Sequence, residues 1–158
     1  MNPTPVSTAI HSWKQNVERA GKMFSGLTDR QLQLEVAPGR NRLLYLWGHL
    51  TAVHDAMLPL LGVGERLHPE LDAAFVKAAD KAVDGLPAPS ALQKYWDEVN
   101  GELLKAFEQF TASDWARKHT AVSEEDFAAN PLRNRLSVLL GRTNHLSYHI
   151  GQAALAPK

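Results

Sequence analysis

Residues 130–155 read NPLRNRLSVLLGRTNHLSYHIGQAAL, a leucine-rich stretch with polar residues between the leucines. Its apolar residues recur three or four positions apart, which is the spacing of one face of an α-helix. Asn130 is a preferred N-cap residue, and Pro131 suits the first helical position because an N–H there would have no partner. We therefore predict a helix that begins at Asn130 and extends to about Leu155.

Three earlier segments show the same helical spacing. The first extends from Thr4 to Phe24 and is ended by Gly26. The second extends from Asn41 to Leu61. The third has Ser90 as its N-cap candidate and extends to Thr111. Pro59 is expected to kink or end the last turn of the second segment. No segment alternates β-branched and polar residues over the length of a strand, so we predict no strands. Four helices of about 20 residues indicate an all-α four-helix bundle.

Shorter elements are predicted in the connections between these helices. Thr28 is an N-cap candidate for a helical turn, because Gln31 follows it at the capping-box spacing. Residues 62–89 form a long connection whose alanine-rich middle predicts a short helix. Further helical turns are expected after Ser113 and Ser123.

Composition restricts the classes of function. The chain has 158 residues, 44% of them hydrophobic, which is enough for a single domain over residues 1–158 whose core needs no metal. Lys plus Arg and Asp plus Glu both total 17, and no basic run suggests a nucleic-acid partner. Cysteine is absent, so histidines and carboxylates remain as metal ligands. With no signal segment and no apolar run near ~18 residues, we expect a cytoplasmic protein without a membrane partner.

A histidine pair near the C-terminus is the clearest candidate site. His145 and His149 are four residues apart, so they lie on one helix face, about 6 Å apart along the axis, and can converge on one ion. A third ligand has to come from another helix. A helical wheel places His49 on a corresponding flank of its own helix, whereas His54 falls within the apolar stripe and is expected in the core.

Alternatives to metal binding remain at this point. Such histidine pairs also arise by chance, and an isolated histidine like His49 is more often an interfacial residue than a ligand. His68 and His119 lie in connections, where we expect solvated side chains.

Three other side chains fall beside these histidines on the wheel. Tyr45 lies near the edge that carries His49, and Arg142 and Gln152 lie near the edge of the pair. Gln152 could orient a ligand imidazole. Arg142 could hold a substrate carboxylate, or it could form an exposed or inter-helix ion pair.

The segments LTDRQL (27–32), LWGHL (46–50) and HLSYHIGQ (145–152) together resemble the DinB superfamily. The resemblance covers essentially the whole chain, and the terminal His-x-Gly-Gln is its most specific part. It implies a four-helix bundle of up-down-down-up type, often dimeric, that binds a divalent ion such as zinc or nickel through three histidines. Carried onto this chain, the metal ligands are His49, His145 and His149.

The resemblance also implies a range of activities. Relatives include S-transferases that use bacillithiol or mycothiol, and a mycothiol-dependent maleylpyruvate isomerase. We therefore expect a homodimer that transfers a low-molecular-weight thiol to an electrophilic small molecule, in keeping with a chain that lacks cysteine. A metal-dependent hydrolase is the first alternative, although Leu146 stands where the HExxH motif has its glutamate. A non-catalytic, dimeric metal- or ligand-binding bundle is the second.

Overall fold

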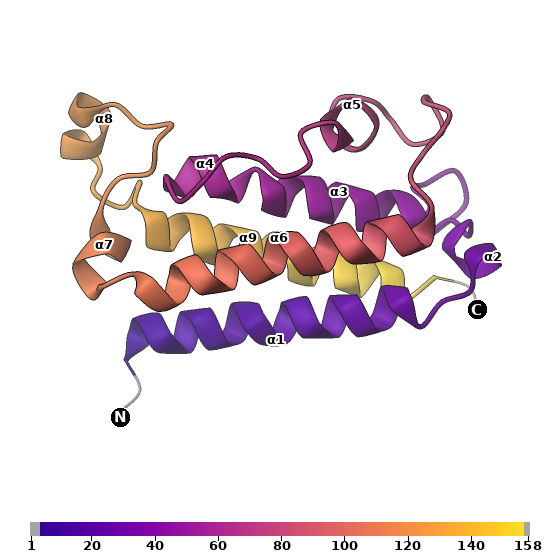
Figure 1. Ribbon diagram of the computed structural model, residues 1–158, viewed down its shortest axis with the longest axis horizontal. Coiled ribbons are helices and arrows are strands. Elements are labelled where there is room, and N and C mark those ends of the chain that lie inside the picture. The colour runs from indigo at the N-terminus through magenta and orange to yellow at the C-terminus, as the bar shows by residue number, and fades with distance from the viewer. Residues whose placement is uncertain (1–3, 157–158) are drawn as a thin grey trace.

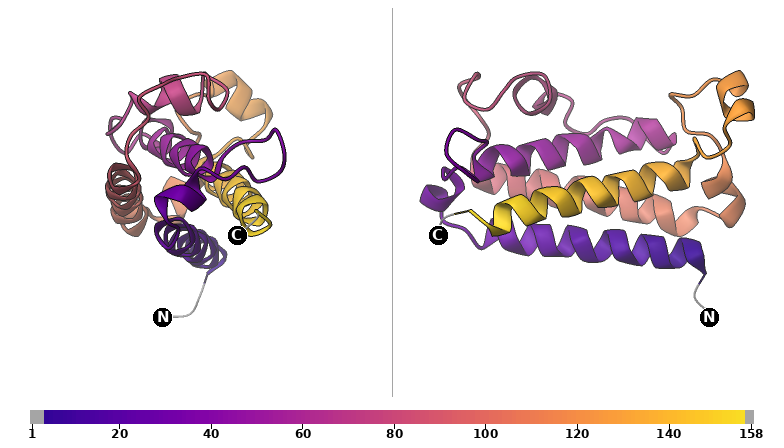
Figure 2. Two further views of the ribbon diagram at one scale, coloured as in Figure 1. Left: turned by 90° about the vertical axis from the view of Figure 1, so that its right-hand side faces the viewer. Right: turned by 180° about the vertical axis from the view of Figure 1, so that it is seen from behind.

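Four long helices lie side by side in the computed structural model, which describes residues 4–156. They are α1 (Pro5–Ser25), α3 (Leu43–Asp55), α6 (Pro89–Gln109) and α9 (Arg135–Ala154). Helices α1 and α9 run in one direction and α3 and α6 in the other (Figures 1 and 2). Helix α1 packs against α9 and α6, and α3 packs against α6 and α9. The α3–α9 interface therefore lies across the molecule from the α1–α6 interface.

Within residues 4–156, five short helices occupy the connections. They are α2 (Asp29–Leu32), α4 (Met57–Leu61), α5 (Leu71–Phe75), α7 (Ala112–Ala116) and α8 (Glu124–Ala129). Thr28 caps α2 as predicted, with its side chain accepting a hydrogen bond from the Gln31 backbone N–H, and Ser123 caps α8. Within residues 4–156 there are no strands, only two isolated bridges, Glu35 with Arg42 and Lys118 with Asn134.

None of the helices within residues 4–156 combines the length and the apolar character that crossing a bilayer requires.

The predicted start of the last helix was wrong by four residues. Helix α9 begins at Arg135, and the Asn134 side chain caps it by accepting a hydrogen bond from the Ser137 N–H at 2.9 Å. Asn130 instead ends α8. The reason is tertiary, because the Arg135 N–H donates to the carbonyl of Arg117 at 2.9 Å and so ties this segment to residues 117–118. Asn130 and Asn134 are both suitable caps, and this pairing selects the second.

Two other helix boundaries also differ from the prediction. Ser90 is not a cap, because α6 has Ala88 as its N-cap and Pro89 in its first turn. The helix predicted from Asn41 to Leu61 is two helices, α3 and α4, which meet at Ala56. Pro59 explains the break, since its ring lacks an N–H and clashes with the carbonyl of the residue four positions earlier.

Buried side chains form two clusters along the bundle. One includes Phe24 and Trp47, whose rings stack with centroids 5.6 Å apart, and extends to Ile150 on α9. The other includes Phe107 and Trp115, packed edge to face with centroids 5.1 Å apart. The first cluster supports the parts of α3 and α9 that carry the predicted ligands.

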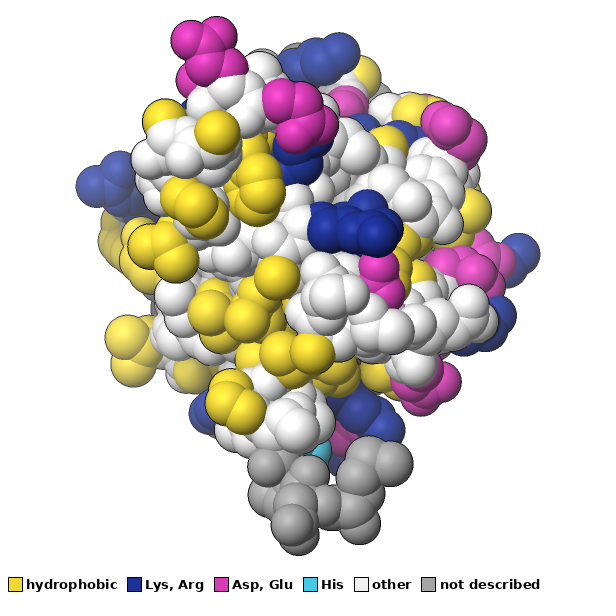
Figure 3. All heavy atoms as spheres, turned by 90° about the vertical axis from the view of Figure 1, so that its left-hand side faces the viewer, with side chains coloured by type: hydrophobic (Ala, Val, Ile, Leu, Met, Phe, Trp, Pro, Cys, Tyr) yellow, Lys and Arg dark blue, Asp and Glu magenta, His cyan; other side chains and the backbone are white. Residues whose placement is uncertain are grey.

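Apolar side chains also gather on the outside of the end of the molecule where α7 and α8 lie (Figure 3). Leu132, between α8 and α9, is 74% exposed, and Leu140 on α9 is 46% exposed. Exposed apolar patches on soluble proteins are frequently contact surfaces.

Candidate metal centre

Three histidines converge between α3 and α9. The Nε2 atom of His145 is 3.3 Å from Nε2 of His49 and 3.1 Å from Nε2 of His149. One ligand atom from each of the three residues lies within 4.8 Å of the others, and all three side chains are half-buried. The α3–α9 packing thus brings together residues that are 96 positions apart in the sequence.

Hydrogen bonds on the far side of two rings determine which nitrogen faces the centre. The Nδ1–H of His49 donates to the carbonyl of Phe75 at 2.7 Å, because a carbonyl can only accept. The Nδ1–H of His149 donates to Oε1 of Gln152 at 2.8 Å, while the amide nitrogen of Gln152 donates to the Tyr148 hydroxyl at 3.0 Å. Both Nε2 atoms therefore point lone pairs at His145.

Proton affinity at the centre also favours neutral rings. Burial, followed by the adjacent His149 and His49, lowers the pKa of His145 to about 4. Burial lowers the pKa of His149 as well. Neutral imidazole is the form that binds metals, so the rings of His145 and His149 are in the ligand form at neutral pH.

The donor set fits a divalent ion. With metal–nitrogen bonds of about 2.0–2.1 Å, neighbouring nitrogens of a tetrahedral site are about 3.3–3.4 Å apart. The separations of 3.1 and 3.3 Å are close to that value. Without a cation, the single Nε2 atom of His145 would face the Nε2 lone pairs of both His49 and His149, and one N–H can satisfy only one of them. The buried Nδ1 atom of His145 has no hydrogen-bond partner within the described chain. Three imidazoles in this geometry could hold zinc, nickel or another divalent transition metal.

Residues of α3 and the following connection fix the orientation of His49. Gly48 allows α3 to approach Phe75 closely, since a Cβ atom at this position would overlap the Phe75 ring. The Phe75 carbonyl is thereby placed to accept from His49. Tyr45 lies parallel to the His49 ring, with centroids 6.3 Å apart, and its hydroxyl donates to the carbonyl of Ala78 at 2.7 Å. The end of α5 and the residues that follow it are thus held against α3 on both sides of the His49 ring's hydrogen bond.

A groove opens beside His149. It has a volume of ≈ 660 Å³ and lies between the segment before α3 and the last turns of α9. Its lining consists of Val36, Ala37, Arg40, Asn41, Tyr148, His149, Gln152 and Leu155. This volume is typical of a small-molecule site.

Gln152, Tyr45 and Arg142, which the sequence placed beside the histidines, have different surroundings in the structure. Gln152 contacts His149 and lines the groove. Tyr45 is 8% exposed and packs on His49, away from the groove lining. Arg142 is partly buried, which lowers its pKa, and no carboxylate of residues 4–156 lies within ion-pair distance of it. The predicted ion pair of Arg142 is therefore absent from the described part of the chain.

The other histidines lie apart from the centre. His54 is buried, as the apolar stripe predicted, and its Nδ1–H donates to Oδ1 of Asn100 at 2.7 Å. His68 and His119 were expected to be solvated, and this was wrong, because both are partly buried. The ring of His68 packs against that of Tyr95 with centroids 3.9 Å apart and a tilt of 30°, so the connection packs onto α6 rather than extending into solvent.

Sequence reasoning missed several residues of the site. The Phe75 carbonyl gives no signal in a side-chain pattern, because any residue has a backbone carbonyl. Arg40 and Asn41 lie in an irregular segment to which no helical wheel applies. Tyr148 could have been found, since it lies four residues before Gln152 on the same helix face.

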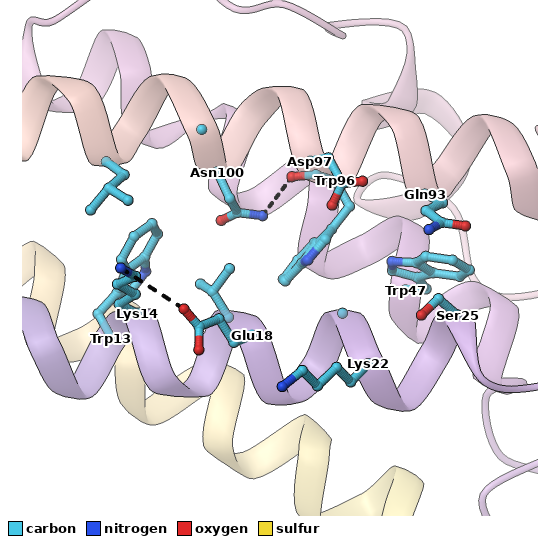
Figure 4. Close-up of a pocket in the computed structure, with 14 residues that line it drawn as sticks. Trp13, Lys14, Glu18, Lys22, Ser25, Trp47, Gln93, Trp96, Asp97 and Asn100 are labelled. Carbon is cyan, nitrogen blue, oxygen red and sulfur yellow. Dashed lines mark hydrogen bonds and ion pairs between the residues drawn. The ribbon is translucent and has the colours of Figure 1, made fainter.

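A second cavity lies across the molecule, between α1 and α6 (Figure 4). It has a volume of ≈ 390 Å³, and the aromatic residues of its lining are Trp13, Trp47 and Trp96. Lys14, Glu18 and Lys22 lie along the α1 side (Figure 4). None of the three converging histidines lines it, so this cavity is separate from the candidate centre.

Comparison with protein families identifies the superfamily to which the chain belongs. No curated protein matches the sequence at a significant level. The family model of the DinB superfamily matches residues 12–153. The match includes all three converging histidines and the four long helices except the first residues of α1 and the last of α9. The chain therefore belongs to the DinB superfamily.

Proposed function

We propose that this protein binds one divalent metal ion, zinc or nickel, through His49, His145 and His149, and that it transfers a low-molecular-weight thiol to an electrophilic small molecule. The observation that carries the proposal is the convergence of three Nε2 atoms beside an open groove. A divalent ion held by these three imidazoles would act as a Lewis acid and would lower the pKa of a thiol or water that binds it.

The chain's own residues would position the reactants. The Nδ1–H group of His49 donates to Phe75, and that of His149 donates to Gln152. These bonds keep the Nε2 atoms of both rings facing the centre. The groove beside His149 gives a small molecule access from solvent. Val36 and Leu155 provide apolar surface for its body.

The absence of a carboxylate base favours thiol transfer over hydrolysis. Among the described residues that line the groove there is no Asp or Glu, and Leu146, which stands at the glutamate position of the HExxH motif, is fully buried. In HExxH enzymes the glutamate takes a proton from the attacking water, whereas a thiol has a much lower ordinary pKa than water and reaches its nucleophilic thiolate form without such a base.

The test is an assay of the metal-loaded protein with bacillithiol, mycothiol, glutathione and cysteine, using monobromobimane as the electrophile. Transfer above the uncatalysed rate with at least one thiol, abolished in His145→Ala, supports the proposal. A nitrophenyl ester tested in parallel measures hydrolysis. Turnover of the ester without thiol transfer would favour the hydrolase, and turnover of neither would favour a binding protein.

A homodimer is a separate proposal, which the exposed Leu132 and Leu140 support. Sedimentation of the purified protein tests it. A mass of one chain over the micromolar range would contradict it.

A further inference from the structure

We propose that the groove beside the histidine centre selects substrates that carry a carboxylate, which Arg40 and Tyr148 bind. The inference deepens the proposed function, since it takes the groove as the path to the centre. It concerns only binding, however, and so can be tested without turnover.

The charged group of the groove lining is positive. Arg40 is the only lysine, arginine, aspartate or glutamate among the eight lining residues. It is exposed, and no carboxylate within residues 4–156 lies at ion-pair distance from it. A guanidinium at the edge of a largely apolar groove recognises planar anions, above all carboxylates, by paired hydrogen bonds.

The acidic residues near this segment have other partners. Glu35 accepts from the Gly39 N–H at 2.7 Å and pairs with Lys81. Asp80 is 5% exposed in its side chain and pairs with Arg42 at 2.7 Å. Neither carboxylate therefore competes for Arg40, whose guanidinium remains free for a ligand.

Tyr148 supplies a second donor. Its hydroxyl accepts a hydrogen bond from Gln152, so the hydroxyl hydrogen is not used in that bond and can be donated into the groove. The side chain is 63% exposed and lines the groove. Because Gln152 also holds His149, the Tyr148 donor lies in the same hydrogen-bonded chain as a predicted metal ligand. A carboxylate between Arg40 and Tyr148 would leave the other end of the substrate close to the centre.

The size of the groove determines what carries the carboxylate. A volume of ≈ 660 Å³ accommodates a small molecule with an apolar body, against Val36, Ala37 and Leu155. One guanidinium balances one negative charge. We therefore assign the site to a monocarboxylate with a short apolar or aromatic body.

The experiment compares phenylacetate with phenylacetamide, which have nearly the same shape and differ in charge. Their dissociation constants are measured by NMR titration of the full-length protein, both as purified and after chelator treatment. We expect phenylacetate to bind about three- to tenfold more tightly than the amide. Arg40→Gln should remove this preference without changing the affinity for phenylacetamide, and Tyr148→Phe should reduce it.

Arg142→Gln is the matched comparison, because Arg142 is a second arginine without an ion pair in the described chain but does not line the groove. It should leave the preference unchanged. Loss of the preference in Arg142→Gln but not in Arg40→Gln would overturn the assignment. So would a preference that disappears on chelation but survives Arg40→Gln, because the anion would then sit on a metal. Absence of saturable phenylacetate binding would also overturn it. A preference that depends on Arg40 in a protein without thiol-transfer activity would support the inference and reject the proposed reaction.

Discussion

Gly48 is the residue of the LWGHL segment on which the orientation of His49 depends. Its lack of a side chain lets the Phe75 ring pack directly on α3, and the carbonyl of Phe75 then accepts from His49. A glycine is therefore needed at position 48, next to His49, because Phe75 packs against it.

Replacing Gly48 by alanine tests this link. We expect Gly48→Ala to displace Phe75, to lower the free energy of unfolding by about 1–3 kcal/mol, and to weaken metal binding about 10–100-fold. Gly141→Ala is the control, because within the described structure its Cβ would point into open space beside its own helix. Gly141→Ala should keep its metal affinity, and its free energy of unfolding should rise by up to about 1 kcal/mol. Urea unfolding and competition with a metal-chelating dye measure the two effects, and equal behaviour of the two variants would contradict the account.

The buried His54 makes stability depend on pH. Burial lowers the pKa of His54 from its ordinary value of 6.5 to about 4. The ring therefore stays neutral in the folded protein while the unfolded chain takes up a proton below about pH 6.5. Above about pH 6.5 His54 does not make the free energy of unfolding depend on pH. As the pH falls from about 6.5 to 4, protonation of His54 in the unfolded chain should lower the free energy of unfolding by about 3 kcal/mol.

Comparison with a double variant isolates this effect from other titrating groups. His54→Leu with Asn100→Leu removes both partners of the buried hydrogen bond, so neither is left unpaired. Urea unfolding in chelator at about pH 7 and pH 4 should show a smaller loss in the double variant than in the wild type. The same loss in both proteins would show that His54 does not carry it.

At the scale of elements, the connection after α4 is anchored by Asp55 at the end of α3. This fully buried carboxylate accepts from Nε of Arg66 at 2.7 Å and from the N–H groups of Leu67 and His68 at 2.8 and 3.0 Å. The segment is thereby fixed against the helix that carries His49.

Removing Asp55 should consequently destabilise the protein strongly. Asp55→Ala leaves Arg66 and two N–H groups without this acceptor, and we expect a loss of about 3–5 kcal/mol in the free energy of unfolding. Asp72 also binds Arg66 at 2.7 Å but is 26% exposed in its side chain, so Asp72→Ala should cost about 1 kcal/mol or less. Chemical denaturation measures both, and a smaller loss in Asp55→Ala than in Asp72→Ala would refute this ranking.

Helix boundaries show how far local sequence signals extend. The starts of α1 and α2 were predictable, because Thr4 and Thr28 form caps with residues three positions later. The start of α9 was not, because Asn130 and Asn134 are equally good caps and a backbone bond to Arg117 selects between them. Contacts between distant segments decide where local signals are ambiguous.

At the scale of the whole molecule, the histidine centre depends on which helices are neighbours. The spacing of His145 and His149 predicted a shared face, and the wheel gave His49 a compatible edge. Neither could show that α3 packs against α9, which is a property of the whole bundle. The family resemblance supplied that pairing, and the structure places the three Nε2 atoms together.

Metal should stabilise this bundle without being needed to fold it, because the core is formed by the two apolar clusters. We expect the metal-free protein to retain its helical circular dichroism. Zinc at about 100 times its dissociation constant should raise the free energy of unfolding by about 2.7 kcal/mol. His145→Ala should show no such gain, and an unfolded metal-free protein would contradict the prediction.

Metal binding by His49, His145 and His149 can be measured as the metal content of tag-free protein, determined by elemental analysis. We expect about one divalent ion per chain in the wild type and in His11→Ala, whose histidine is exposed and is not one of the three converging histidines. We expect almost complete loss of the ion in His49→Ala, His145→Ala and His149→Ala. A wild-type protein that holds no metal after incubation with zinc or nickel, or ligand variants that retain it, would contradict metal binding by these histidines.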